Sequence, residues 1–144
     1  MIIDTHITLS FGTEGTATID DVLRTVKELP IDGVCILGWN RMPPAGEIRA
    51  KAAESGVPVF FGIEIASGKG SLLCYPPDIE DGEVVASIDS FLSAGDYEPS
   101  KVIDFFHEEG GAVVASFPYG KETGFGDQIF HINGLDGIEI ATPP

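Results

Sequence analysis

Residues 58–66 read PVFFGIEIA, an apolar run that carries one carboxylate, Glu64, two positions before its end. Aromatic and β-branched residues fill most of the run, and this composition favours a strand. The turn-forming sequence SGKGS follows at residues 67–71. We therefore predict a strand at 58–66 that returns through a hairpin into a short strand at 72–75.

Short apolar runs alternate with helical patterns on both sides of this hairpin. The alternation is typical of parallel strands joined by crossover helices. It predicts an α/β fold of about five main parallel strands with an added hairpin. The other strands are expected at 2–9, 32–38, 111–117 and 136–141, and helices at 19–29, capped by Thr18, at 45–55, and twice within the acidic segment 78–109.

The length and composition are those of one globular domain. The chain has 144 residues, of which 43% are hydrophobic and 22% are charged, enough to bury a core in a single domain over residues 1–144. No apolar run reaches the roughly 20 residues of a membrane-spanning helix, and no secretory leader is evident at the N-terminus. We therefore expect no membrane association and a cytoplasmic location.

The charge of the chain argues against nucleic-acid binding. The protein is acidic, with 23 acidic residues against 8 basic ones and a net charge of −15. Such a surface repels the phosphate backbone of DNA and RNA. Nucleic acid is therefore not expected as a partner.

Four short motifs, taken in order, resemble the polymerase and histidinol phosphatase (PHP) family over nearly the whole chain. They are Asp4-Thr5-His6, GIEI at 62–65, ASFP at 115–118 and GIEI again at 137–140. The resemblance implies a distorted, TIM-barrel-like fold of about seven strands. It also implies two or three metal ions at the C-terminal rim and hydrolysis of phosphate esters. For this chain it implies an incomplete or distorted (β/α) barrel from a divergent, C-terminally short member.

The resemblance assigns two metal ligands to this chain. His6 is the first histidine of the family's opening motif, and Glu64 stands where a bridging carboxylate is expected. Asp4 would orient His6 from outside the metal's coordination sphere or act as a weak ligand. Glu14, in the loop after the first strand, is an alternative oxygen ligand, although a solvated carboxylate is the simpler interpretation.

Other ligand positions of the family hold residues that bind metal poorly or not at all. Thr8 replaces the second histidine of the opening motif, Trp39 stands at the corner after the second strand, and Phe117 replaces the histidine of the family's Ala-His-Pro motif. Indole and phenyl rings offer a metal no lone pair. We expect Trp39 and Phe117 to line a pocket instead.

These replacements weaken the expected chemistry. Two ligands hold a divalent Zn, Mn or Fe ion poorly, so we expect weak metal binding or none. The resemblance then predicts a phosphoesterase-family domain with weakened or lost catalysis. Any residual activity would use metal-activated water against a phosphate ester, and no catalytic residue is identified. The alternatives are an active hydrolase completed by ligands from a second subunit, and a non-catalytic binding or scaffolding module.

Five main strands leave a barrel of this type open. An open sheet exposes backbone donors at its edges, which proteins commonly cover by pairing. We therefore expect a homodimer, or a partner domain that completes the barrel. A phosphate ester is the ligand that the resemblance suggests.

Overall fold

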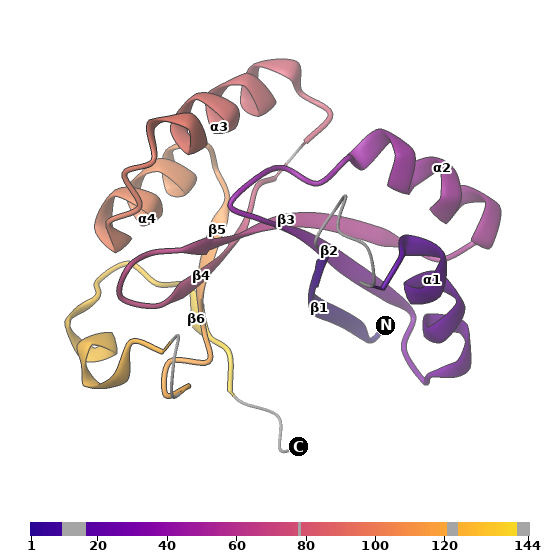
Figure 1. The fold of residues 1–144 in the computed structure, drawn as a ribbon, viewed down its shortest axis with the longest axis horizontal. Coiled ribbons are helices and arrows are strands. Elements are labelled where there is room, and N and C mark those ends of the chain that lie inside the picture. Colours follow the sequence, from indigo (N-terminus) through magenta and orange to yellow (C-terminus); the bar gives the residue numbers. More distant parts are fainter. Residues whose placement is uncertain (10–16, 78, 121–123, 141–144) are drawn as a thin grey trace. The chain divides into compact units, whose positions relative to one another are not determined.

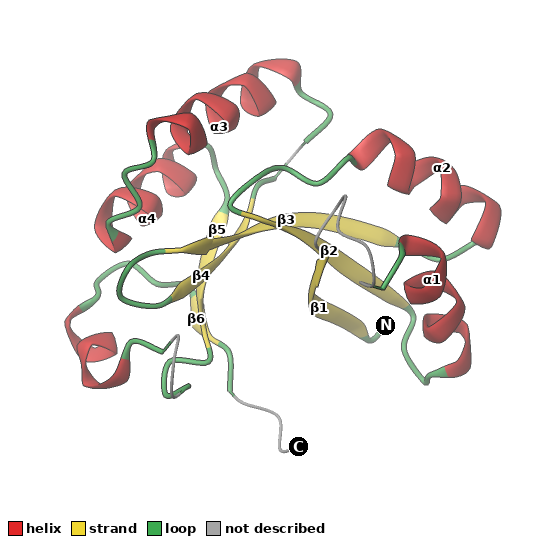
Figure 2. Cartoon of the chain, viewed as in Figure 1, coloured by secondary structure: helices red, strands yellow, loops and turns green. Residues whose placement is uncertain are grey.

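The structure of the protein, a computed structural model, describes residues 1–9, 17–77, 79–120 and 124–140. Its residues form two compact units, Met1–Ile63 and Glu64–Pro144. The expectation of one domain stays a prediction. Figures 1 and 2 show the elements, which follow one another as β1 (Ile3–Leu9), α1 (Ile19–Glu28), β2 (Gly33–Trp39), α2 (Ala45–Ser55), β3 (Val59–Ala66), β4 (Ser71–Tyr75), α3 (Gly82–Ala94), α4 (Pro99–Glu108), β5 (Ala112–Ser116), the 3-10 helix η1 (Gly126–His131) and β6 (Gly137–Ile138).

The first unit contains the strand order β1-β2-β3, with α1 and α2 as the connections. β1 and β2 are parallel, as predicted. α1 and α2 contact each other, and their positions in the first unit can be followed in Figure 1. This arrangement confirms the expected strand–helix alternation over the N-terminal half of the chain.

Helix α1 begins where the sequence predicts. Thr18 is its N-cap, and the Thr18 hydroxyl accepts from the Asp21 backbone N–H at 3.2 Å while the Asp21 carboxylate accepts from the Thr18 backbone N–H at 3.1 Å. This reciprocal capping box satisfies two helix donors that would otherwise lack partners. Leu23 and Val26 are buried, on the face of the helix opposite its exposed residues. The predicted amphipathic helix is confirmed, one residue shorter than expected.

Strand β2 forms the centre of the first unit. Its residues from Gly33 to Gly38 are all buried, and only Trp39 at its end is exposed. An unalternating apolar run is what a strand covered on both faces requires. The prediction of a fully buried second strand is therefore confirmed, with the strand shifted by one residue.

The second unit holds the strand order β3-β4-β5-β6, in which β3 enters from the first unit. β4 is antiparallel to β5, and β5 is parallel to β6. The predicted hairpin after β3 is confirmed, because the Ser67 N–H donates to the Gly70 carbonyl at 2.8 Å and β4 follows. The sheet therefore has six strands and mixed direction, and the α/β class is confirmed.

An aromatic cluster between α3 and α4 forms part of the second core. Phe106 is fully buried, and it meets Phe105 edge to face with ring centroids 5.2 Å apart. Phe105 stacks on Phe91 of α3 at 4.2 Å. The acidic segment thus forms the two predicted helices, and the structure shows that their aromatic side chains pack together. No helix of the described ranges is long and apolar enough to cross a membrane.

The last strand is much shorter than expected. The sequence predicts a strand at 136–141, but β6 contains only Gly137 and Ile138, and Ala141 lies outside the described residues, as does Glu14. β6 pairs with Val114 and Ala115 of β5. The predicted extent is wrong because β5 itself ends at Ser116, beyond which Phe117 turns the chain with φ of +36° and offers no further ladder.

The 3-10 helix η1 is a feature that the sequence analysis missed. It follows Phe125, whose ring lies so close to the β3–β4 turn that a Cβ on Gly70 would come within 2.6 Å of it. Phe125 and Ile129 are buried. A 3-10 helix of six residues makes only about two turns, which is too short to show a clear hydrophobic period in the sequence. Its buried contacts are made by Phe125 and Ile129.

Candidate functional site

Asp4 and His6 lie on β1 at a break in its pairing with β2. Asp4 pairs with Val34 and Ile7 with Ile36, so three steps along β1 match two steps along β2. β1 therefore has one extra residue between these two pairs. Such a β-bulge changes the direction of nearby side chains and is frequent beside active sites. The Asp4 carboxylate accepts from the His6 backbone N–H at 3.0 Å. Asp4 therefore holds the backbone of His6, whose side chain is half-buried.

Trp39 ends β2, and its indole is 43% exposed. The next residue, Asn40, has φ of +49°, in the left-handed region. Asparagine tolerates this conformation better than most residues. The chain thus turns sharply at the corner where the resemblance would place a metal ligand, and it presents an aromatic ring there.

Glu64 is a buried carboxylate on β3, with 7% of its surface exposed. Carboxylates are rarely buried without partners, so most of the 23 acidic residues of this protein are expected at its surface. Among the described residues, no buried side-chain nitrogen or oxygen lacks a hydrogen-bond partner. Burial therefore distinguishes Glu64 from an ordinary surface acid.

Phe117 follows β5 directly and has φ of +36°. A bulky residue in the left-handed region is strained, and such strain gathers at functional sites. Among the residues that the structure describes, Phe117 and Asn40 are the non-glycine residues with positive φ. Phe117 follows β5 and Asn40 follows Trp39 at the end of β2, the two corners where the resemblance would place a ligand.

The predicted site residues fall into both units. Asp4, His6 and Trp39 belong to the first unit, whereas Glu64 and Phe117 belong to the second. The structure brings Asp4 and His6 together. Convergence of His6, Glu64, Trp39 and Phe117 on one rim stays a prediction.

The donor set of the residues that the structure describes does not fit a catalytic metal centre. Within the described ranges, no group of three or more His, Cys, Asp or Glu side chains is arranged to hold a metal ion. Catalytic zinc sites use three protein ligands and an open position. Trp39 and Phe117 add no ligand to this set, since indole and phenyl rings offer a metal no lone pair.

A largely apolar cavity of about 460 Å³ lies at the carboxyl ends of the parallel strands β5 and β6. Figure 1 locates the two strands. The Glu139 carboxylate at this place accepts from the Ser116 hydroxyl at 2.9 Å. Two segments form the wall, with Phe117, Pro118, Tyr119 and Gly120 after β5, and Ile138, Glu139 and Ile140 at the end of β6.

The sequence analysis did not identify Tyr119 and Glu139 as site residues. A signal was available for Glu139, since the second GIEI motif repeats the pattern around Glu64. The sequence pattern does not give the pairing register of β5 and β6. In the structure Ala115 pairs with Ile138, and this register places Ser116 beside Glu139. Tyr119 follows a strand end, and no sequence pattern marks it.

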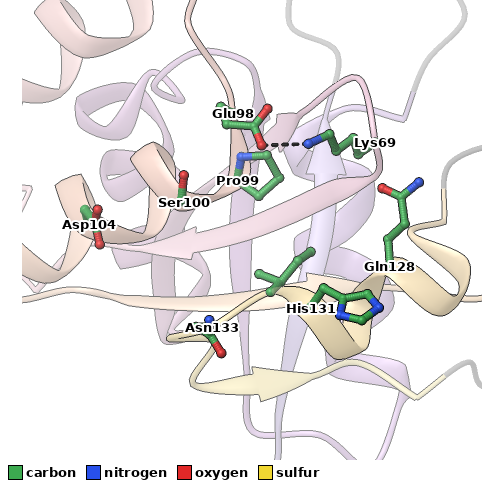
Figure 3. Close-up of a pocket in the computed structure, with 9 residues that line it drawn as sticks. Lys69, Glu98, Pro99, Ser100, Asp104, Gln128, His131 and Asn133 are labelled. Atoms are coloured by element: carbon green, nitrogen blue, oxygen red, sulfur yellow. Dashed lines mark hydrogen bonds and ion pairs between the residues drawn. The ribbon is translucent and has the colours of Figure 1, made fainter.

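A second cavity, of about 320 Å³, is lined mainly by polar residues and lies elsewhere in the second unit. Figure 3 shows the Lys69 amine and the Glu98 carboxylate paired in its wall, at 2.7 Å. Both side chains are about half exposed, so this ion pair contributes little to stability, about 0–1 kcal/mol. The start of α4 supplies Ser100, and η1 supplies Gln128 and His131. None of the residues predicted for the site lines this cavity.

His107, the third histidine besides His6 and His131, has a structural contact. Its Nε2 lies 2.8 Å from an oxygen of the Asp136 carboxylate, which also accepts from the Val113 backbone N–H at 2.7 Å. The Val113 hydrogen bond and the His107 ring lower the pKa of Asp136. This pair ties α4 to the chain before β6 and lies outside both cavities.

Comparison with known proteins supports the fold and leaves the family open. No family model matches the chain. An uncharacterized protein of Methanocaldococcus jannaschii is 28% identical over 123 residues, which make up 83% of this chain and 63% of that relative. The chain thus spans less than two thirds of the length of the curated relative it matches.

Two solved structures share the fold at low identity. A proposed metal-dependent phosphoesterase of Bifidobacterium adolescentis is similar with a TM-score of 0.71 and 17% identity, over 99% of this chain and 79% of that one. An amidohydrolase of Chromobacterium violaceum, with bound sulfate and no metal, is similar with a TM-score of 0.65 and 15% identity, over 96% of this chain and 76% of that one. The fold is therefore one that phosphoesterase-like and amidohydrolase-like proteins use.

Proposed function

We propose that this chain is a divergent domain of the polymerase and histidinol phosphatase type, in which phosphoesterase catalysis is weakened or lost and the rim serves ligand binding. The fold similarity to a proposed metal-dependent phosphoesterase supports the phosphoesterase part of this proposal. An incomplete or distorted barrel is the architecture that it implies. Fold alone does not establish activity, so the argument rests on the site.

The observation that carries the proposal is the corner at Phe117. The residue keeps a strained backbone, with φ of +36°, at the position where the family resemblance places a histidine ligand. Strain of this kind persists only where surrounding structure enforces it. The backbone also departs from regular strand geometry at the bulge beside His6 and at Asn40, which has a positive φ. Both residues lie at or next to positions where the resemblance places a ligand. A strained corner that carries a phenyl ring in place of a ligand is what a hydrolase domain would retain after it had lost catalysis.

Metal analysis tests the proposal directly. The chain, purified without chelator, is analysed for Zn, Mn and Fe beside His6→Ala, and both are assayed with p-nitrophenyl phosphate. We expect well below one metal ion per wild-type chain and no turnover above that of His6→Ala. Near-stoichiometric metal that His6→Ala loses together with turnover would overturn the proposal and favour an active hydrolase.

Restoring the replaced ligands gives a complementary test. In the variant that combines Thr8→His, Trp39→His and Phe117→His, we expect metal content to rise above that of the wild type, because imidazole nitrogens replace groups that offer metal little or nothing. A variant with Trp39→Tyr and Phe117→Tyr controls for changes in packing. Unchanged metal content in a folded histidine variant would contradict the inferred ligand positions.

The predicted homodimer, or a partner domain completing a barrel, stays a prediction. Light scattering at micromolar concentration tests the homodimer. A monomeric mass would argue against it.

A further inference from the structure

We propose that the second cavity, the one lined by Lys69 and by residues of α4 and η1, binds a neutral polyhydroxylated molecule such as a monosaccharide or a cyclic polyol. The inference goes beyond the proposed function, because the described residues that line this cavity include none of those assigned to the rim. It follows from the position, the charges and the hydrogen-bonding capacity of the polar groups in the wall.

Polar side chains from three segments of the second unit surround this cavity, as Figure 3 shows. Lys69 comes from the turn between β3 and β4, and Ser100 and Asp104 come from α4, where they lie one turn apart on the same face. Gln128 belongs to η1, and Asn133 follows it. All five residues are exposed, so a ligand can replace the water that their polar groups bind. The volume of about 320 Å³ is at the lower end of the roughly 300–1,000 Å³ usual for ligand pockets.

The wall carries charges of both signs, and this disfavours a ligand with a net charge. The Lys69 ammonium pairs with the Glu98 carboxylate at 2.7 Å, and Asp104 adds a second carboxylate to the wall. An anion in the cavity would be repelled by the two carboxylates, and a cation would be repelled by the ammonium. A neutral ligand meets neither repulsion, and it can still form hydrogen bonds with all three groups.

The hydrogen-bonding groups of the wall are a mixture of donors and acceptors. The Lys69 ammonium only donates, the Asp104 carboxylate only accepts, and the amides of Gln128 and Asn133 do both. A hydroxyl group also donates and accepts, so hydroxyls on several neighbouring carbons can match such a mixture in any arrangement. A ligand with donors alone, or with acceptors alone, would leave some wall groups unpaired, and an unpaired polar group covered by a ligand is costly.

The apolar part of the wall is small. Among the lining residues drawn in Figure 3, Pro99 and Ile132 are the apolar ones; Pro99 is buried and Ile132 is half-buried. Pockets for drug-like molecules are instead lined predominantly by apolar side chains. The ligand that suits this cavity is therefore mainly polar with a limited apolar contact, and a sugar ring provides both, because its C–H groups lie beside its hydroxyls.

Six neutral polyols test the proposal: glucose, galactose, mannose, xylose, ribose and myo-inositol. Binding of each to the full chain is followed by two-dimensional NMR of the backbone amides. We expect at least one of them to shift the amides of Lys69, of residues 100–104 and of residues 128–133. This polyol should bind about tenfold more tightly than cyclohexanol, which has a six-membered ring but one hydroxyl. No binding of any of the six, or shifts confined to other residues, would overturn the proposal.

Charged probes test the other ligand classes at the same amides. Inorganic phosphate serves as the anion, tetramethylammonium as the cation and glycine betaine as the zwitterion. We expect each of the three to bind more weakly than the best polyol, because each brings a charge close to a wall group of the same sign. A charged probe that binds the cavity as tightly as the best polyol would overturn the proposal and identify the class of ligand that replaces it.

Matched variants assign the effect to individual side chains. Gln128→Met and Asn133→Leu each replace an amide by an apolar group of similar size, and we expect the two together to weaken binding of the best polyol about tenfold. Ser90→Ala removes a polar group from an exposed position of α3 that does not line the cavity, and it should leave the affinity unchanged. A folded double variant that binds the polyol as tightly as the wild type, or an equal loss in Ser90→Ala, would overturn the proposal.

These outcomes separate this inference from the proposed function. Metal content and phosphate-ester turnover decide whether catalysis survives, and neither measurement uses the polyols. An active metal enzyme that binds a polyol at residues 128–133 would overturn the proposed function and leave the polyol site standing. A metal-free, inactive chain that binds none of the six polyols would do the reverse.

Discussion

The hydroxyl of buried Ser116 donates a hydrogen bond of 2.9 Å to the carboxylate of Glu139. The two residues are 23 positions apart in sequence. Ser116 is the last residue of β5, and Glu139 directly follows β6. This hydrogen bond joins the two segments that form the wall of the apolar cavity, and it fixes the position of the cavity's carboxylate.

Removing the Ser116 hydroxyl should loosen this wall. In Ser116→Ala, Glu139 loses a buried partner, and we expect the free energy of unfolding to fall by about 1 kcal/mol, the usual contribution of one hydrogen bond. Urea denaturation measures this change. Ser100→Ala, at an exposed position of α4, is the matched control. Equal small effects in both variants would show that the bond contributes nothing to stability.

The strain at Phe117 predicts an unusual order of stability between two truncated variants. Alanine is normally the more stable of the pair, since glycine loses more backbone entropy on folding. At φ of +36° the order should reverse, with Phe117→Gly about 1 kcal/mol more stable than Phe117→Ala. Both variants lose the ring, so their difference isolates the backbone. Urea denaturation of both variants measures it, and an alanine variant at least as stable as the glycine one would argue against strain.

Asp136 should make stability depend on pH in the acidic range. The Val113 N–H and the His107 ring lower the pKa of Asp136 in the folded state. Its contribution is therefore present above the unfolded pKa of about 3.9 and is lost as the pH falls through the folded pKa. Since the Asp136 side chain is 43% exposed, we expect Asp136→Asn to lower the free energy of unfolding at pH 7 by only about 1 kcal/mol.

Urea denaturation of the Asp136→Asn variant at pH 7 and at pH values below 4, at constant ionic strength, checks this expectation. The difference from the wild type should shrink in acid, because the wild-type carboxyl is then neutral as well. Asp127→Asn removes the same charge at an exposed position of η1 and serves as the control. A wild-type–variant gap that stays constant across this range would contradict the assignment.

Much of the secondary structure followed from local patterns. The apolar runs placed β1 to β5 within one or two residues, and Thr18 marked the start of α1 correctly. These features depend on residues that are close in sequence, where side-chain period and capping chemistry act directly. β6 and η1 were harder, since a two-residue strand has no period and a short 3-10 helix has a weak one.

The site was less accessible to sequence reasoning. Motif order pointed to His6, Glu64 and Phe117, but motifs carry residue types and not backbone geometry. The bulge at His6 and the positive φ of Phe117 arise where one strand must fit its neighbour, which depends on the pairing register. The same holds for the hydrogen bond between Ser116 and Glu139.

Residue order alone accounts for the α/β class, the buried second strand and the absence of metal-binding groups at Trp39 and Phe117. These are properties of composition and short-range pattern, which every copy of the chain carries before it folds. The apolar cavity, with Glu139 in its wall, exists only after β5 and β6 pair, because pairing brings Ser116 and Phe117 beside residues 138–140. Contacts between residues far apart in sequence depend on how the strands pack, and therefore on the tertiary fold.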